Sequence, residues 1–390
     1  MQTSPNNKLA SNSYSFSSDS YFCFLVTLQA IAKFMDAGST DKLVTSASNE
    51  IRTTEFNIDH ENTEQLVTNT VVVYLMKNKT LVNVAYDDRR YTINFSSDHN
   101  LDELVKNIKA FVKTKNVLRN KHVKVSETNQ GFWATFEPTP STSVGNVVID
   151  KALKDEIMEN TVFHLKEMET SNGIILHGPP GTGKSLSCSL VINKAIEEGF
   201  STCYLTSRVD YSEFAEFLNE FMSPCIVILE DIDSFAIQRT GHGYSMISDF
   251  LQFLSGITQD KEKMVVIATT NYINMLDEAI ANRPARFNRK FAFTHPDPNA
   301  IDQLIDLYFG KNVINKVLKA LCYDKQFCGA HIAEIKNTAL RMSKKYKTPL
   351  AKQFERAVKT ISKHFENGPV ASKEVTVPSN QYNPNLAGHH

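Results

Sequence analysis

The stretch Gly173-Ile174-Ile175-Leu176-His177-Gly178-Pro179-Pro180-Gly181-Thr182-Gly183-Lys184-Ser185 joins a short apolar run to a glycine-rich loop. Its last eight residues have the spacing G-x-x-x-x-G-K-S, between an expected strand and an expected helix that extends to Gly199. Glycines let the backbone close around phosphates and aim N–H groups at them, and a helix N-terminus favours negative charge. The pattern therefore predicts a phosphate-binding loop, in which Lys184 reaches the β- and γ-phosphates and the Ser185 hydroxyl coordinates Mg²⁺.

A second apolar run, Ile226–Leu229, ends in the acidic cluster Glu230-Asp231-Ile232-Asp233. On a strand adjacent to the phosphate loop, these carboxylates would face Mg²⁺ and the attacking water. A buried strand with a solvated acidic end is the alternative interpretation. The phosphate loop upstream favours the catalytic one.

Two weaker patterns follow. Ile267–Asn271 is an apolar strand ending in an amide that would orient water against the γ-phosphate, although asparagine after a strand is also ordinary turn chemistry. Asn282–Arg289 carries three arginines, which either neutralise charge on the transferred phosphoryl group or belong to a solvated loop.

The alternation of strands and helices from Gly173 onward predicts an α/β domain with a parallel sheet and helices on both faces. Upstream, helix and strand patterns predict a separate α+β domain. Downstream, strand signals vanish and helical periodicity predicts a small helical domain. The expected boundaries are a disordered segment at 1–20, the α+β domain at 21–136, a Pro/Ser/Thr linker at 137–143, the α/β domain at 144–295, the helical domain at 296–366 and a flexible tail at 367–390.

The composition argues against several classes of protein. The 390 residues include 42 Lys+Arg and 43 Asp+Glu, so charge gives no support for a broadly basic nucleic-acid surface. The most apolar segment, Tyr21–Ala37, is interrupted by Gln29, Lys33 and Asp36, and we expect neither a membrane span nor a signal peptide. Six cysteines without metal-binding spacing suggest a reducing, cytoplasmic location.

Taken in order, the four motifs resemble the AAA family of ATPases over roughly 144–365. The resemblance implies that Gly178–Ser185 binds ATP and Mg²⁺, and that Glu230 and Asp231 occupy the magnesium and base positions, with Glu230 acting on Mg²⁺ through water. It implies that Asn271 is the first sensor, and that Arg283 and Arg286 are arginine fingers offered to the neighbouring subunit. It further implies that Ile149 and Asp150 flank the adenine, and that Gly329 and Ala330 begin the helix of a lid near the base and ribose.

Some positions depart from the usual family pattern. The acidic pair is Glu230-Asp231 where most members have Asp then Glu, and Asp231 is one methylene shorter than a glutamate base. Which of the two is the base stays open. The segment Leu229–Asp233 resembles the branch that includes the mitochondrial Rieske-protein translocase, and Ser207–Tyr211 lacks the usual aromatic-hydrophobic-glycine pore loop. His331 replaces the acidic residue that commonly follows the Gly-Ala pair.

The sequence therefore predicts a chaperone-like, Mg-ATP-hydrolysing ring ATPase that remodels or translocates a client, most simply a protein. Arginines acting in trans require a head-to-tail interface, which closes by rotation, and we expect a hexamer. Two alternatives stay open: a nucleic-acid motor or loader, and a nucleotide-switched scaffold with slow turnover.

Overall fold

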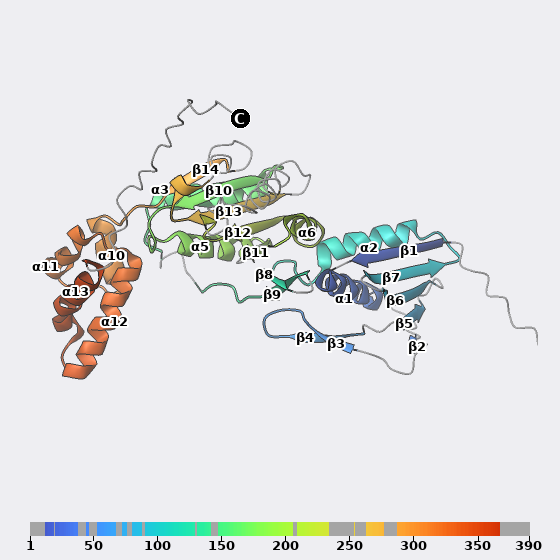
Figure 1. Ribbon diagram of the computed structural model, residues 1–390, viewed down its shortest axis with the longest axis horizontal. Helices are drawn as coiled ribbons and strands as arrows, with labels where there is room; N and C mark the ends of the chain where they lie inside the picture. Colours follow the sequence, from blue (N-terminus) through green and yellow to red (C-terminus); the bar gives the residue numbers. More distant parts are fainter. Residues whose placement is uncertain are drawn as a thin grey trace, which may run out of the picture. The chain divides into compact units, whose positions relative to one another are not determined.

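The computed structural model describes residues 12–18, 20–37, 44–46, 53–67, 72–75, 80–87, 90–128, 131–141, 147–205, 209–233, 253, 263–276 and 287–366. The chain forms two compact units, Met1–Thr294 and His295–His390, which are described separately (Figure 1).

A seven-stranded sheet organises the first unit, in the order β14-β10-β13-β12-β11-β8-β9. All neighbouring strands are parallel except the pair β8 and β9. The strands are β8 (His122–Thr128), β9 (Gly131–Phe136), β10 (Asn172–His177), β11 (Ser201–Leu205), β12 (Cys225–Leu229), β13 (Met264–Thr270) and β14 (Arg289–Ala292). This confirms the mostly parallel sheet that the strand and helix alternation predicts.

The central strands are buried on both faces, as parallel strands covered by helices usually are. Along β12, Ile226 and Ile228 belong to one hydrophobic cluster, whereas Val227 and Leu229 belong to another. The first cluster includes side chains of α5 (Lys184–Glu197), and the second includes side chains of α6 (Tyr211–Phe217). The shorter helical segments here are α3 (Lys151–Met158), η2 (Glu159–Phe163), α4 (His164–Glu167), η3 (Leu218–Met222) and η4 (Ile273–Met275).

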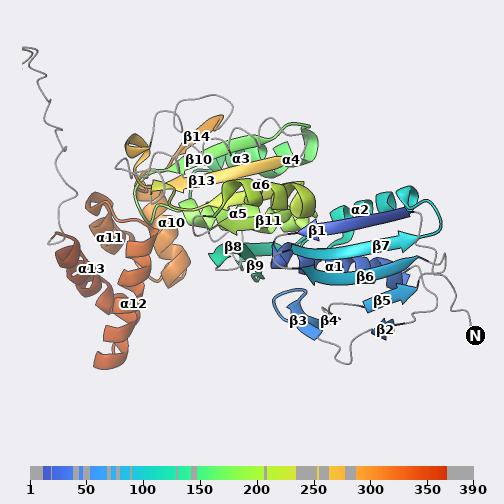
Figure 2. The ribbon, with the colours of Figure 1, turned by 45° about the vertical axis from the view of Figure 1, so that its right-hand side comes forward.

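The N-terminal part adds a five-stranded antiparallel sheet, in the order β1-β7-β6-β5-β2, and a separate hairpin (Figure 2). Its elements are β1 (Asn12–Ser18), α1 (Tyr21–Ala37), β2 (Val44–Ser46), β3 (Thr53–Asn57), β4 (Thr63–Val67), β5 (Val72–Leu75), β6 (Leu81–Asp87), β7 (Arg90–Ser97) and α2 (Asp102–Lys115). Composition favours disorder for residues 1–20, but Asn12–Ser18 form a strand. Tyr14 and Phe16 alternate with serines and pack on the core, with the Phe16 and Phe95 rings 5.8 Å apart. Residues 1–11 lie outside the described residues.

The N-terminal part and the parallel sheet share one hydrophobic cluster, which differs from the separate domains expected on either side of 137–143. Val123 of β8 pairs with Cys203 of β11, so β8 and β9 complete the parallel sheet. Without them β11 would present an unpaired edge. Arg119 Nη1 also donates to the carbonyls of Met222 and Ser223, at 2.7 and 2.6 Å. The expected linker therefore does not separate two independent cores.

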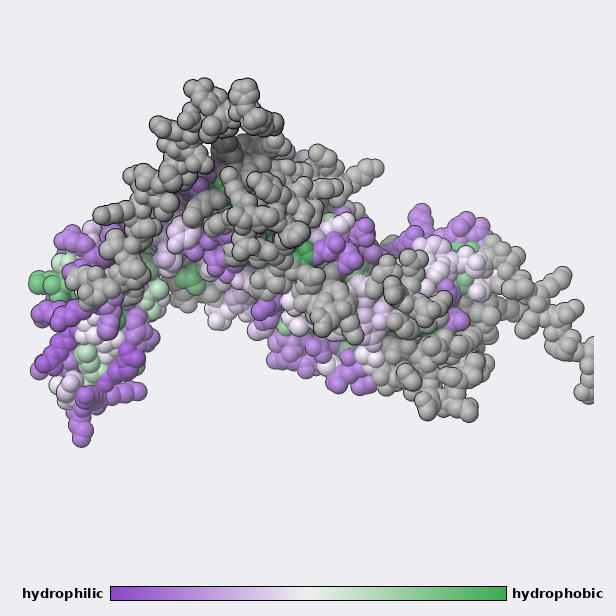
Figure 3. Space-filling view, viewed as in Figure 1, coloured by the Kyte–Doolittle hydropathy of each residue, from purple (hydrophilic) through white to green (hydrophobic). Residues whose placement is uncertain are grey.

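The second unit is helical, as the periodicity of 296–366 predicts. It contains α10 (Pro298–Phe309), α11 (Lys316–Lys319), η5 (Ala320–Lys325), α12 (Gly329–Tyr346) and α13 (Leu350–Glu366). The rings of Phe309 and Phe354 meet edge to face at 5.2 Å in its interior. The surface of this helical unit that Figure 3 shows is largely hydrophilic. The tail expected at 367–390 lies outside the described residues.

Among the described helices, none combines the length and the apolar character that crossing a bilayer requires.

Candidate nucleotide-binding site

The loop between β10 and α5 adopts a conformation that its glycines permit. Gly178, Gly181 and Gly183 have φ values of 142°, 75° and 110°. A Cβ on Gly178 would lie 2.0 Å from the carbonyl oxygen of Phe293, and a Cβ on Gly183 would lie 3.2 Å from Ile149 Cγ2. The loop is therefore closely packed against the chain just after β14 and against the expected adenine-flanking segment.

Lys184 is the first residue of α5 and is only 6% exposed. Its Nζ donates hydrogen bonds to the carbonyls of Gly178 and Pro179, at 2.6 and 2.9 Å, and to Asn271 Oδ1 at 2.8 Å. An ammonium group has three donors, and these contacts use all of them. Burial lowers the pKa of Lys184, while Asp231, Asp233 and Glu230 act in the opposite direction.

The strand order places Asn271 between the phosphate loop and the acidic cluster. The acidic strand β12 was expected beside the loop strand β10, but β13 lies between them. Asn271 follows β13 directly. Its Nδ2 lies 3.4 Å from Asp231 Oδ1 and its backbone N–H lies 3.4 Å from Asp233 Oδ1. The structure thus brings Lys184, Asn271 and Asp231 together in one hydrogen-bonded series.

Asp231 is held in a left-handed conformation, with φ of 48°. Its backbone N–H donates to Thr269 Oγ1 at 3.0 Å, and the next N–H, of Ile232, donates to the Thr269 carbonyl at 3.0 Å. Although the side chain of Asp231 is exposed, partial desolvation by the surrounding protein raises the pKa of its carboxyl. The charges of Asp233 and Glu230 raise this pKa further, whereas Lys184 lowers it. A carboxylate with a raised pKa accepts a proton more readily near neutral pH.

Glu230 has different surroundings from those of Asp231. Its Oε2 accepts a hydrogen bond from the hydroxyl of Tyr204, which lies on the neighbouring strand β11. The two adjacent carboxylates are thus held by different partners, Glu230 by a tyrosine hydroxyl and Asp231 by an asparagine amide.

The oxygen donors at this edge of the sheet suit the magnesium ion that the motifs imply. The Ser185 side chain is exposed beside Lys184 at the start of α5. Together with the carboxylates of Glu230 and Asp231 it offers only oxygen atoms, and Mg²⁺ prefers oxygen ligands while retaining several waters. Among the described residues, no group of three or more His, Cys, Asp or Glu side chains is arranged to hold a metal ion directly.

Of the other predicted site residues, some lie near the phosphate loop, some lie in the second unit, and some fall outside the described residues. Ile149 lies against the loop, as the Gly183 contact shows. Asp150 caps α3, since its Oδ1 accepts from the Leu153 N–H at 3.0 Å. Gly329 and Ala330 begin α12 in the second unit, where His331 Nδ1 accepts from the Cys328 N–H at 3.0 Å. His331 therefore completes a helix cap in place of the acidic residue. Arg283 and Arg286 lie outside the described residues.

Sequence reasoning missed three contributors to the site: Tyr204, Thr269 and Phe293. Thr269 lies inside the Ile267–Asn271 motif, so its hydroxyl is at least a visible candidate. Tyr204 and Phe293 carry no signal in the sequence, because each contacts a part of the site that is distant along the chain.

Comparisons with known proteins agree with this geometry. Residues 174–295 match the family described as "ATPase family associated with various cellular activities (AAA)". Relatives include proteasome-activating nucleotidase 2 of Halobacterium salinarum, 30% identical over 216 residues, which are 49% of this chain and 50% of the relative. The cell division cycle protein 48 homolog of Archaeoglobus fulgidus is 30% identical over 242 residues, which are 55% of this chain and 33% of the relative.

A third relative, the 26S proteasome regulatory subunit 8 homolog of Schizosaccharomyces pombe, is 25% identical over 344 residues, 78% of this chain and 82% of the relative. The chain spans about half of the length of the nucleotidase and a third of that of the cell division cycle protein 48 homolog. An AAA ATPase domain is thus present in this chain. The finer resemblance to the Rieske-protein translocase branch stays a prediction.

Proposed function

We propose that this chain, through its AAA domain, is an Mg-ATP-hydrolysing ring ATPase that remodels or translocates a protein client. The observation that carries the proposal is the hydrogen-bonded series from Lys184 through Asn271 to Asp231. It connects the ammonium that would contact the phosphates with a carboxylate that would accept a proton from water.

The phosphate loop supplies the binding chemistry. Backbone N–H groups of Gly178–Ser185 would hold the phosphates, and Lys184 would exchange its loop carbonyls for the β- and γ-phosphate oxygens. The Ser185 hydroxyl and, through a water, Glu230 would hold Mg²⁺. When bound, Mg²⁺ would neutralise the charge that develops on the transferred phosphoryl group.

We assign the base to Asp231 and the magnesium position to Glu230. Asp231 is exposed to solvent, adjoins the amide of Asn271 and has a raised pKa. Glu230 is restrained by Tyr204. In this assignment Asn271 orients the water, and Asp231 takes its proton as the water oxygen bonds to the γ-phosphorus. The bond from the γ-phosphorus to the β–γ bridging oxygen breaks, and ADP leaves with that oxygen.

The remaining elements would serve assembly and coupling. Ile149 lies next to Gly183, which supports an adenine contact there, and Asp150, Gly329 and Ala330 stay candidates from the resemblance. Arg283 and Arg286 would complete the site of a neighbouring subunit in a closed ring, most simply a hexamer. The helical unit would act as the lid, and the N-terminal part would engage the client.

Two observations support a protein client in the cytoplasm. Two relatives carry the proteasome in their names, and proteasomes act on proteins. All six cysteines are free thiols, which fits a reducing compartment.

Phosphate release in the presence of Mg²⁺ tests the central claim. Lys184→Ala should reduce turnover at least about a hundredfold, because it removes a charge aimed at the reacting phosphates. Lys194→Ala is the matched control, since this lysine lies exposed on the same helix and pairs only with Glu197 and Glu198 in that helix's last turn and C-cap. Unchanged turnover in Lys184→Ala would contradict the proposal.

The client class is tested with the parental protein. Added protein substrates should stimulate ATP turnover, whereas DNA and RNA should not. Stimulation by nucleic acid alone would favour the motor or loader instead, and negligible turnover under all conditions would favour the nucleotide-switched scaffold.

A further inference from the structure

We infer that Tyr204 is a positioning residue that gives the two adjacent carboxylates their separate roles, by restraining Glu230 for the magnesium position and leaving Asp231 as the base. This inference rests on the proposed function and extends it to a residue outside the motifs.

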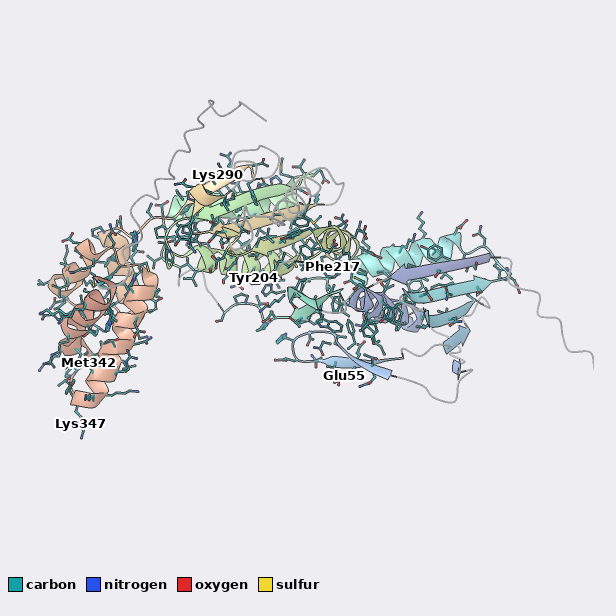
Figure 4. All side chains as sticks on the ribbon, in the orientation of Figure 1. Glu55, Tyr204, Phe217, Lys290, Met342 and Lys347 are labelled. Carbon is teal, nitrogen blue, oxygen red and sulfur yellow. The ribbon has the colours of Figure 1, made fainter. Side chains whose placement is uncertain are left out.

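The strand register places Tyr204 beside the acidic end of β12. Tyr204 pairs with Ile228, two residues before Glu230, and its hydroxyl donates to Glu230 Oε2. The ring packs against the hydrophobic cluster that includes Ile226, Ile228 and Cys188. Figure 4 labels Tyr204 within the parallel sheet. The ring is thus fixed by packing, and the hydroxyl reaches the carboxylate from a rigid support.

The hydroxyl of Tyr204 is the donor in this contact. A phenol keeps its proton near neutral pH, since its unperturbed pKa is about 10. A carboxylate offers only acceptor oxygens, so Glu230 Oε2 accepts from the phenol. The contact therefore ties the side chain of Glu230 to the packed ring of Tyr204.

The same contact limits what Glu230 can do. One carboxylate oxygen, Oε2, is occupied by the phenol, which leaves Oε1 to accept from a water on Mg²⁺. Asp231 instead receives a 3.4 Å contact from Asn271 Nδ2. Tyr204 thus restrains Glu230 alone and leaves the Asp231 carboxylate to its contact with Asn271.

The test replaces Tyr204 with phenylalanine, which keeps the ring and removes the donor. We expect nucleotide affinity without Mg²⁺ to stay within about twofold of the parental value. The Mg²⁺ concentration that half-maximally tightens binding of a fluorescent ATP analogue should rise about tenfold, the loss expected for one hydrogen bond to a charged group. The kcat should fall by a similar factor at saturating Mg²⁺, with little change in the KM for ATP.

Tyr323→Phe is the matched control, because the Tyr323 hydroxyl donates to the carboxylate of Asp302 at 2.7 Å in the helical unit. It makes the same chemical change and should leave the Mg²⁺ dependence unaltered. Tyr204→Leu is a second variant, since it also removes the phenol donor while keeping an apolar side chain against the cluster. It should reproduce the Mg²⁺ shift if Tyr204→Phe proves unstable.

A double-mutant comparison decides whether Tyr204 acts through Glu230. In a Glu230→Ala background, which has no acceptor for the phenol, adding Tyr204→Phe should have almost no further effect on the Mg²⁺ dependence. A full additional loss there would overturn the inference. So would an unchanged Mg²⁺ dependence in a Tyr204→Phe protein that melts like the parent. If the parental protein hydrolyses ATP and needs Lys184, either result refutes the role of Tyr204 alone and leaves the proposed function standing.

Discussion

Lys184 Nζ donates a hydrogen bond to Asn271 Oδ1 across 2.8 Å, although 87 positions separate the two residues in the sequence. The adjacency of β10 and β13 makes this contact possible. The Asn271 amide also faces Asp231, so a change in the position of Lys184 can reach the proposed base through a single side chain.

Asn271→Ala should therefore separate binding from turnover. The variant removes an acceptor from Lys184 and a donor from Asp231, but leaves the loop that would hold the phosphates. We expect ATP affinity within a few-fold of the parental value and a kcat about a hundredfold lower, measured by calorimetry and phosphate release. Asn160→Ala is the control, since the exposed Asn160 amide donates to the Glu156 carbonyl of the preceding helix α3, away from the phosphate loop. A parental kcat in Asn271→Ala would remove this residue from the mechanism.

Asp233→Asn should move the acid limb of the pH–rate profile to lower pH. Asp233 is one of the charges that raise the pKa of Asp231, and a base must be deprotonated to act. Removing that charge lowers the Asp231 pKa, so activity should persist at a more acidic pH than in the parent. The variant still offers an oxygen to the Asn271 N–H. Asp155→Asn, at an exposed position of α3, should leave the acid limb unmoved. An unmoved limb in Asp233→Asn would contradict the assignment of Asp231 as the base.

Gly178→Ala should destabilise the protein more than Gly199→Ala does. Both glycines have positive φ, 142° and 86°, where an L side chain is strained by roughly 1–2 kcal/mol. Only at Gly178 does the added Cβ also meet an atom, the Phe293 carbonyl oxygen at 2.0 Å, whereas at Gly199 nothing lies within 4 Å. Urea unfolding of both variants measures the difference. Equal losses would show that the loop can move away from Phe293.

Lowering the pH should reduce the free energy of unfolding through His122, a residue of β8 whose side chain contacts β11. This side chain is 8% exposed, and its Nδ1 lies 2.8 Å from Thr202 Oγ1. Burial lowers the pKa of His122 from 6.5 to about 4. The unfolded chain binds this proton more readily, so its contribution to stability is complete above pH 6.5 and is lost progressively toward pH 4.

Urea unfolding at pH 7 and pH 5 tests this effect of His122. The parent should lose about 2 kcal/mol more between these conditions than His122→Gln does. His60→Gln, at an exposed position, should lose as much as the parent. Identical losses in His122→Gln and the parent would place His122 in contact with solvent.

A chain that begins at Glu137 should fail to fold. It lacks β8 and β9, so it exposes the edge of β11 and removes the buried side chains of Leu118, Val123 and Val125 from the shared cluster. A chain that begins at Asn12 keeps β1 and should melt like the parent. Soluble expression and thermal melting compare the two. A cooperative transition and ATP turnover in the shorter chain would show that the sheet tolerates the loss.

The phosphate loop and the central strands were predictable from the sequence because their signals are local. Glycine spacing between Gly178 and Gly183 specifies a loop that needs positive φ, and the uninterrupted apolar runs of β12 and β13 specify strands covered on both faces. The acidic residues after β12 and Asn271 after β13 follow from the same reasoning, since strand ends in a parallel sheet face one edge.

Strand order and contacts across the sheet depended on tertiary structure. The order β10-β13-β12 places Asn271 between Lys184 and Asp231. No local sequence pattern distinguishes this strand order from one in which β12 lies beside β10. The pairing of β8 with β11 joined the N-terminal part to the parallel sheet across a segment whose composition resembles a linker. The bond from Tyr204 to Glu230 spans 26 positions and two strands. Such contacts depend on the register of the paired strands and on the connections that set their order. Burial of the whole core fixes both, whereas the residues in contact do not fix them by themselves.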